Sequence, residues 1–255
     1  MNYTYGRGEV HFATFKPGSY DPAGYRYIGN TPAFGFTNQV QELDHNSSDH
    51  GVGELDFSIP TSITRSGTLT TDDISLENLA LSFFGSRATV TQTAATGQTE
   101  TFTATVPGLS YQLGYTTAKP MGIRNVTNVV VTVGAAAKVA GSDYQVDLAR
   151  GLVQILPGGS IAAGASITVT YDTISSSFDQ VLSGSTPVEG AIMFVADNPA
   201  GKNIDVLLPW VRLTPNGEFA LKAENALQQL QFNMKVLKVA GRSAAYLNGQ
   251  PYTGA

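Results

Sequence analysis

The sequence predicts a mainly β fold with one short helix, and three observations carry that prediction. Apolar and polar residues alternate with period two along several stretches, only one segment has a helical period, and the 255 residues include 27 Thr, 19 Ser and 27 Gly. Charged residues make up only 14% of the chain, against about 25% in average soluble proteins. A 42% hydrophobic content excludes disorder and is enough for one large domain, alone or with a smaller one inserted.

The alternation is clearest over residues 53–69 and 230–236. In the first run the apolar positions are Leu55, Phe57, Ile59, Ile63 and Leu69. This pattern predicts a long strand, or a bent pair of strands, with one buried and one solvent-facing side. Further strands are expected at 9–15, 33–42, 191–196, 204–213 and 218–222. The Asn216-Gly217 pair predicts a hairpin between the last two.

One helix is expected, over about residues 75–84. Ser75 can cap its N-terminus, Glu77 lies in its first turn and Gly85 ends it. Apolar residues follow at helical spacing, at Leu76, Leu79, Ala80, Phe83 and Phe84. A single apolar stripe of this kind predicts a helix that packs on a sheet.

The centre of the chain predicts a small β module inserted into the main domain. Residues 88–106 are Thr-rich and predict a hairpin around Thr96-Gly97. Four short strands separated by turn residues follow, at 129–133, 144–147, 152–156 and 167–171. The run Ser175-Ser176-Ser177 predicts a linker back to the main body. We therefore expect a discontinuous main domain, 1–117 with 174–255, and a small sandwich-like module over 118–173.

The sequence carries none of the common catalytic or nucleotide-binding motifs. It has no G-x-S-x-G, H-E-x-x-H, Walker or G-x-G-x-x-G pattern, and no cysteine for a disulfide or metal site. No catalytic residue and no cofactor is predicted, and we expect a protein that is not an enzyme. The absence of an apolar run of about 18 residues and of a signal-peptide core predicts a soluble protein. A net charge of −5 argues against tight binding to nucleic acid.

The richest polar segment is 42–51. Asp44, Asn46 and Ser48 imitate the first three positions of a calcium loop, but position twelve is Leu55 rather than Glu. We therefore predict a polar turn between two long strands and no metal site.

Acidic residues concentrate in residues 42–77, where eight Asp and Glu accompany Arg65 as the single Arg or Lys. Two explanations are open. One is an ordinary solvated face, and the other is a surface that repels a polyanion, so that DNA or RNA passes it without sticking. The alternation places Glu54 and Asp56 on the solvent-facing side of one strand, which suits a channel lining.

Several segments together resemble a known family. They are the turn E-L-D-H at 42–45, the helix S-L-E-N-L-A-L-S-F-F-G at 75–85, and three closing strands: E-G-A-I-M-F-V-A-D-N, I-D-V-L-L-P-W-V-R-L-T-P-N-G-E-F-A-L-K-A and Q-L-Q-F-N-M-K-V-L-K. In their order and in their amino-acid sequences, these segments resemble the major tail tube protein of long-tailed, non-contractile bacteriophages. The stretch G-S-D-Y-Q-V-D-L-A-R-G-L-V-Q-I-L-P-G-G-S-I at 141–161 also resembles a small β module of phage virion proteins.

The resemblance implies a structural virion protein. Six subunits would form a ring around a hollow β-barrel, and the rings would stack into the tail tube that conducts DNA during ejection. The partners implied are further copies of the chain, a tape measure protein and a terminator protein. Phage DNA would pass without tight binding, assembly would occur in the host cytoplasm, and no membrane would be involved. The inserted module would decorate the outside of the tube.

The resemblance also implies roles for particular residues. Strands 33–44 and 53–69 would line an acidic lumen, with the charges coming from Glu42, Asp44, Glu54 and Asp56. Contacts between subunits or rings would come from segment 15–32 and loop 46–51, and the candidates are Tyr20, Tyr25, Tyr27, Asn46, Ser47, Ser48, Asp49 and His50. Aromatic residues among Gly and Pro suit an interface, although simple local packing of the tyrosines is the alternative.

Three other classes remain open at the level of sequence. A carbohydrate-binding or adhesin-like β-sandwich would present an aromatic platform and form no hollow assembly. A head-to-tail connector would form one ring and never stack. An enzyme is the third class, and the sequence offers no motif for it.

Overall fold

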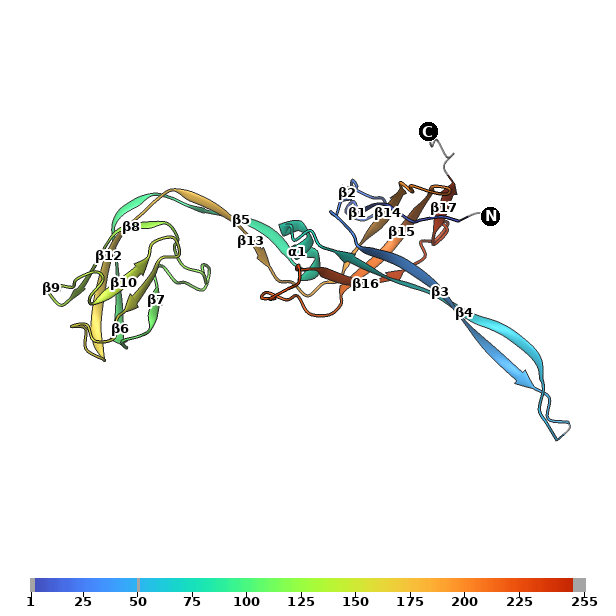
Figure 1. Ribbon diagram of the computed structural model, residues 1–255, viewed down its shortest axis with the longest axis horizontal. Coiled ribbons are helices and arrows are strands. Elements are labelled where there is room, and N and C mark those ends of the chain that lie inside the picture. Colours follow the sequence, from blue (N-terminus) through green and yellow to red (C-terminus); the bar gives the residue numbers. More distant parts are fainter. Residues whose placement is uncertain (1–2, 50, 250–255) are drawn as a thin grey trace. The chain divides into compact units, whose positions relative to one another are not determined.

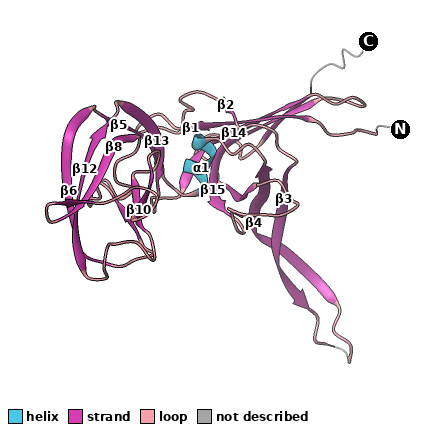
Figure 2. Ribbon diagram, turned by 60° about the vertical axis from the view of Figure 1, so that its left-hand side comes forward, coloured by secondary structure: helices cyan, strands magenta, loops and turns pink. Residues whose placement is uncertain are grey.

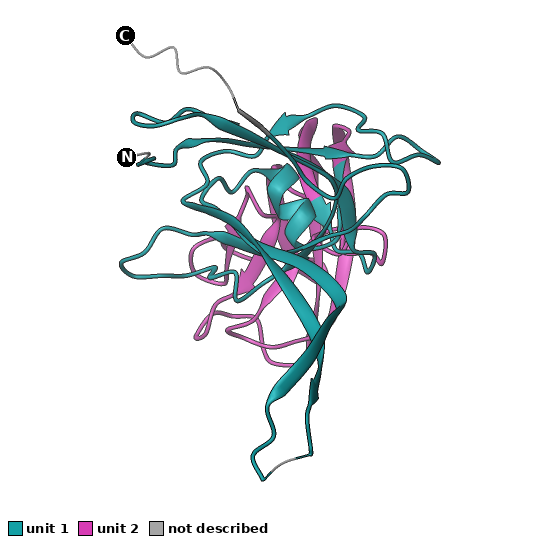
Figure 3. Ribbon diagram, turned by 90° about the vertical axis from the view of Figure 1, so that its right-hand side faces the viewer, with its two compact units in different colours: residues 1–88, 181–255 teal, residues 89–180 magenta. Residues whose placement is uncertain are grey.

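The computed structural model describes residues 3–49 and 51–249 of the chain. It divides into two compact units, shown in different colours in Figure 3: unit 1 comprises Met1–Ala88 with Val181–Ala255, and unit 2 comprises Thr89–Gln180. Strands account for 54% of the chain and helix for 3%, so the predicted mainly β fold with one short helix is confirmed. Among the described residues, no helix has both the length and the apolar character needed to cross a lipid bilayer.

Unit 1 is built on an eight-stranded antiparallel sheet (Figures 1 and 2). Its strands are β1 (Gly8–Thr14), β2 (Arg26–Tyr27), β3 (Ala33–Asn46), β4 (Leu55–Thr71), β14 (Val188–Ala196), β15 (Ile204–Pro215), β16 (Leu230–Val236) and β17 (Tyr246–Gly249). They lie in the order β2-β1-β14-β15-β16-β4-β3, with β17 paired to β15. The alternation predicted for 230–236 is confirmed, because β16 buries Leu230, Phe232, Met234 and Val236 and exposes the residues between them.

The helix α1 (Leu76–Ser82) lies where the sequence places it (Figure 2). Ser75 caps it by accepting a hydrogen bond from the backbone N–H of Asn78. The residue in left-handed backbone conformation at its C-terminal end is Phe84 (φ 50°) rather than Gly85. Leu79 packs against the core of unit 1 as predicted, which fixes the helix on the sheet.

Unit 2 contains two sheets that enclose a core of their own. One has the order β6-β12-β8-β9 and the other β10-β11-β7. The strands are β6 (Ala95–Thr105), β7 (Ser110–Gln112), β8 (Val126–Val133), β9 (Ala136–Ala137), β10 (Tyr144–Asp147), β11 (Leu152–Ile155) and β12 (Ala165–Thr173). Val131, Val153, Ile155, Ile167 and Val169 are fully buried in this core. A separate pair, β5 (Ser86–Gln92) with β13 (Ser176–Leu182), spans the boundary between the units along the chain.

Several local predictions are wrong, and each error concerns which strands pair. Residues 88–106 form no hairpin, because β6 pairs with β12 and β5 with β13. The inserted unit therefore begins at Thr89 rather than at residue 118. Two of the three residues of the expected Ser linker, Ser176 and Ser177, are part of strand β13. The hairpin at Asn216-Gly217 is also absent: residues 218–222 form no strand, and β15 pairs with β16.

Candidate functional site: an exposed two-stranded arm

The outer halves of β3 and β4 leave the sheet together and form what we call the arm, residues 37–64. Strand β4 pairs with β16 only from Arg65 to Thr71. Beyond Arg65, the described part of the two strands pairs only with itself. Figure 1 shows this hairpin projecting from the rest of unit 1. Its residues with described burial are all exposed except Ser47, which is half-buried. The arm is thus a pair of strands without a core.

At the root of the hairpin, one face packs on the core of unit 1. Phe34 pairs with Leu69, which is buried, and Phe36 pairs with Gly67. Both phenylalanines contact the core cluster. We call this side the core-side face; the pair Val40 and Ile63 lies on it further out, because residues two apart on a strand share a face.

A β-bulge then exchanges the apolar and polar sides of the arm. Gln41 pairs with Ser62 but Glu42 pairs with Pro60, so Thr61 is an extra residue on β4. Beyond it, Glu42 and Asp44 occupy the core-side face. The apolar pair Leu43 and Ile59 lies on the opposite face.

The predicted separation of 53–69 into one buried and one solvent-facing side is therefore wrong. Large apolar side chains are exposed on both faces of the arm, at Val40, Leu43, Leu55, Phe57, Ile59 and Ile63. The physical reason is twofold. No second layer covers this part of the sheet in the described chain, and the extra residue shifts the parity of β4 so that Ile59 and Ile63 face opposite ways.

The structure brings two of the four predicted lumen acids together. The Ser58 hydroxyl lies 2.7 Å from Oδ1 of Asp44 and 3.3 Å from Oε2 of Glu42, so it can donate to either carboxylate. Asp56 instead contacts Nδ1 of His45 at 2.5 Å. Glu54 precedes β4, and its backbone carbonyl accepts from the N–H of Ser47.

All four acids are exposed and lie on the arm. The arm contains five Asp and Glu and no Lys or Arg. No Lys or Arg of the arm therefore compensates its negative charge. A channel lining that repels nucleic acid requires such a charge, and so does a contact with a basic partner.

The tip of the arm carries the predicted contact residues Asn46, Ser47, Ser48 and Asp49. Asn46 pairs with Leu55 as the last pair of the hairpin. His50 lies outside the described residues. Within the described ranges, no three His, Asp or Glu side chains gather in a metal-binding arrangement.

The three candidate tyrosines each make local contacts and stay partly exposed. The Tyr20 ring lies 4.6 Å from that of Trp210, and the Tyr27 ring lies 5.6 Å from that of His11. Tyr25 lines a cavity of about 300 Å³ with Pro209, and burial raises the pKa of its hydroxyl. All three are at least 36% exposed, so local packing leaves ring surface for a partner.

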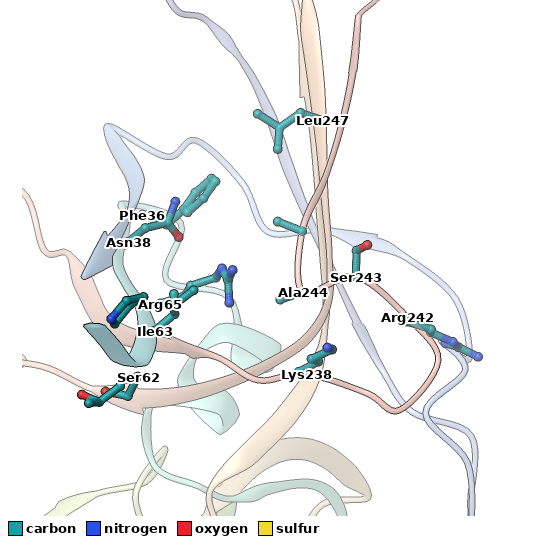
Figure 4. Close-up of a pocket in the computed structure, with 13 residues that line it drawn as sticks. Phe36, Asn38, Ser62, Ile63, Arg65, Lys238, Arg242, Ser243, Ala244 and Leu247 are labelled. Atoms are coloured by element: carbon teal, nitrogen blue, oxygen red, sulfur yellow. The ribbon is translucent and has the colours of Figure 1, made fainter. Parts of the chain in front are cut away.

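The sequence missed a basic groove of about 900 Å³ at the root of the arm (Figure 4). It is lined by Phe36, Asn38, Pro60, Thr61, Ser62, Ile63, Arg65, Lys238, Arg242, Ser243, Ala244, Ala245 and Leu247. Strands β3 and β4 supply one wall and the segment after β16 supplies the other. The basic run Lys235, Lys238 and Arg242 is the sequence signal that could have indicated part of it.

Comparison with known proteins identifies a family without a described activity. A family model with the description "Protein of unknown function UCP028589" matches residues 3–250, and the chain belongs to that family. A search of curated proteins found no match. Any function must therefore be argued from the arm, the groove and the core.

Proposed function

We propose that this family member is a structural protein that assembles with copies of itself. Specifically, we propose the tail tube subunit of a long-tailed, non-contractile phage, forming hexameric rings that stack into a hollow tube for DNA. The observation that carries the proposal is the arm. It exposes large apolar side chains on both faces, whereas the rest of the sheet in unit 1 also buries many such residues in a core.

The arm is hard to account for in an isolated subunit. A lone two-stranded hairpin is marginally stable in water, and this one exposes seven large apolar side chains, six on its strands and Val52 in its loop. Covering such a side chain completely contributes about 1.5–3 kcal/mol. A second copy that covers the arm would therefore gain a substantial driving force for association, which supports an assembling subunit over a monomeric enzyme or adhesin.

The edges of the sheet support the same proposal. Strand β3 ends the sheet, and no described strand pairs with its outer edge along Ala33–Asn46. The other end of the sheet is closed by β2, which has only two residues and so offers little to pair with. A molecule with one long open edge and a blunt opposite edge favours head-to-tail association, which generates rings or filaments.

Exposure of Glu42, Asp44, Glu54 and Asp56 suits the acidic lumen that the resemblance implies, because like charge keeps DNA from adhering. Exposure equally suits a contact with a basic surface. The lumen assignment of these four residues therefore stays a prediction.

Negative-stain electron microscopy of the purified protein tests the proposal. We expect rings or tubes from the wild type and dispersed, folded subunits from Phe57→Asp and from a deletion of residues 46–51. Tyr115→Asp is the matched control, since Tyr115 is 63% exposed but lies in unit 2. It should assemble as the wild type does.

Two outcomes would overturn the proposal. One is a wild type that remains dispersed at high concentration, and glycan binding by such subunits would favour the adhesin class. The other is normal tubes from both arm variants. Single rings that never stack would favour a connector.

A further inference from the structure

The basic groove carries positive charge that the described residues compensate only in part. Arg65 and Lys238 line it, and neither side chain makes a hydrogen bond or ion pair within residues 3–49 and 51–249. The third cation, Arg242, is paired with Asp21 at 2.5 Å, and it holds the pKa of that carboxyl below its usual value. Two cations are therefore available to an acidic ligand.

The groove also has apolar walls that remain open. Ile63 and Leu247 line it and are both exposed, while Phe36 is half-buried beside them. Figure 4 shows Arg65 and Ile63 on the strand wall, and Lys238 and Leu247 on the segment that faces it. A ligand that fits must combine carboxylates with apolar surface, which excludes a small inorganic anion as the best match.

The arm has this combination of chemistry. Glu42 and Asp44 are neighbours on its core-side face and stand two residues apart, which is about 7 Å along a strand. Pro60 lies beside Glu42, and Val40 precedes it on the same face. Neither carboxylate has a basic partner among the described residues, and each instead lies within hydrogen-bond distance of the Ser58 hydroxyl.

The acids of the same subunit make no ion pair with the cations of the groove in the described part of the chain. Pro60, the cross-strand partner of Glu42, lines the outer end of the groove, so Glu42 lies at its rim. Arg65 pairs with Asn38, and Glu42 and Asp44 lie about 13 and 20 Å further along the strand than Asn38. Acids that face Arg65 and Lys238 directly would therefore come from another molecule.

We propose that the groove of each subunit receives the core-side face of a neighbour's arm, with Glu42 and Asp44 of the neighbour against Arg65 and Lys238. This inference rests on the proposed self-assembly and specifies which surfaces of two copies meet. It assigns two of the four acids to a contact between copies, and leaves Glu54 and Asp56 for a lumen. A contact between the acids of one copy and the cations of the next can repeat head-to-tail from copy to copy.

A charge-reversal experiment tests this pairing. The arm variant carries Glu42→Lys and Asp44→Lys, and the groove variant carries Arg65→Glu and Lys238→Glu. Each variant alone places like charges in the contact, so we expect its critical concentration for assembly to rise about tenfold or more. Sedimentation and electron microscopy at low salt measure the effect, since charge contacts are screened at high salt.

Mixing the two variants gives the sharper result. The reversed arm of one fits the reversed groove of the other, and the native arm of the second fits the native groove of the first. We therefore expect the equimolar mixture, and a single chain with all four changes, to assemble close to the wild-type concentration. The control Glu218→Lys with Glu224→Lys makes the same change of charge at exposed acids outside the arm and the groove, and it should assemble alone.

The outcomes separate this inference from the proposed function. If the wild type never assembles, the self-assembly proposal fails. If the wild type assembles but the mixture does not recover, or neither variant is impaired, the arm-to-groove pairing is wrong and self-assembly stands. DNA binding that the groove variant loses while its assembly stays intact would assign the groove to a polyanion and overturn the pairing.

Discussion

The arm and unit 2 have similar sequence patterns, but the apolar residues of the arm are exposed and those of unit 2 are buried. Both consist of Thr- and Ser-rich strands with apolar residues at alternate positions. In unit 2, strand β12 buries every second residue from Ile167 to Thr173. In the arm, Leu55, Phe57 and Ile59 also stand at every second position, and they remain exposed.

The difference lies in whether a second layer exists. Strand β12 has the sheet β10-β11-β7 to pack against, and the two sheets share one core. The arm has no such layer in the described chain. Alternation in the sequence therefore predicts which residues can be buried. The tertiary structure determines whether the layer that buries them belongs to the same molecule. For the arm, we infer that this layer belongs to another molecule.

The largest expected effect is a difference in folding between the two regions when each is produced as an isolated fragment. We expect residues 86–182 to fold alone, because unit 2 has its own core, and residues 33–71 to remain unfolded, because a lone hairpin is marginal in water. Circular dichroism with thermal melting distinguishes a cooperative transition from its absence. A stable hairpin, or an unfolded unit 2, would remove the contrast on which the assembly argument depends.

A matched pair of phenylalanines is expected to give the next largest effect. Phe232 is 2% exposed in the core of unit 1, and Phe57 is 60% exposed on the arm. In dispersed subunits, Phe232→Ala should lower the free energy of unfolding by about 3–5 kcal/mol. Phe57→Ala should change it by less than about 0.5 kcal/mol. Urea denaturation measures both, and a large loss from Phe57→Ala would mean that the arm packs within its own subunit.

The sequence predicted the features that depend on local pattern. The alternation of β16 and the N-terminal cap of α1 at Ser75 need only residues close along the chain, and both were found. The position of Thr61 as an extra residue was missed, although Pro60 was an available signal, because proline in a strand often marks a bulge or an edge.

The errors share one cause, which is pairing between distant segments. Strand β6 belongs to unit 2 because it pairs with β12, 60 to 78 residues later, and its Thr-rich pattern does not indicate that partner. The groove joins Arg65 to Lys238, and no local pattern relates the two. The sequence could therefore indicate candidate residues on a single hairpin, but it could not indicate the groove that we propose to bind them.

A smaller effect is expected from the same substitution at two places on β4. Thr71 is buried at the root, and its hydroxyl lies 3.0 Å from the carbonyl oxygens of Ile28 and of Asn30, so it can donate to either. Thr71→Val keeps the shape, removes the donor and should cost about 1–3 kcal/mol. Thr64→Val lies on the exposed arm and should change stability by less than about 0.5 kcal/mol. Equal losses in thermal melts would show that the root and the arm are not different environments.

The smallest expected effect concerns the carboxylates of unit 2 at low pH. Backbone N–H groups of Val139 and Ser160 donate to Asp143, and these bonds hold the pKa of its carboxyl below its usual value. A carboxyl with a lowered pKa in the folded state contributes stability above the unfolded pKa, and that contribution is lost as the pH falls through the folded value. We therefore expect the melting temperature of unit 2 to fall below about pH 4.

Asp143→Asn tests the cause of that decline. The variant should melt below the wild type at pH 7, and the gap between them should narrow as the pH is lowered, because the wild-type carboxyl then becomes neutral as well. Glu54→Gln on the arm is the control, since no hydrogen bond of its side chain is found in the described part of the chain. If the difference in melting temperature stays constant from pH 7 to below pH 4, Asp143 stabilises unit 2 by its shape rather than by its charge. Acids in the inserted unit would then matter to folding no more than those on the arm.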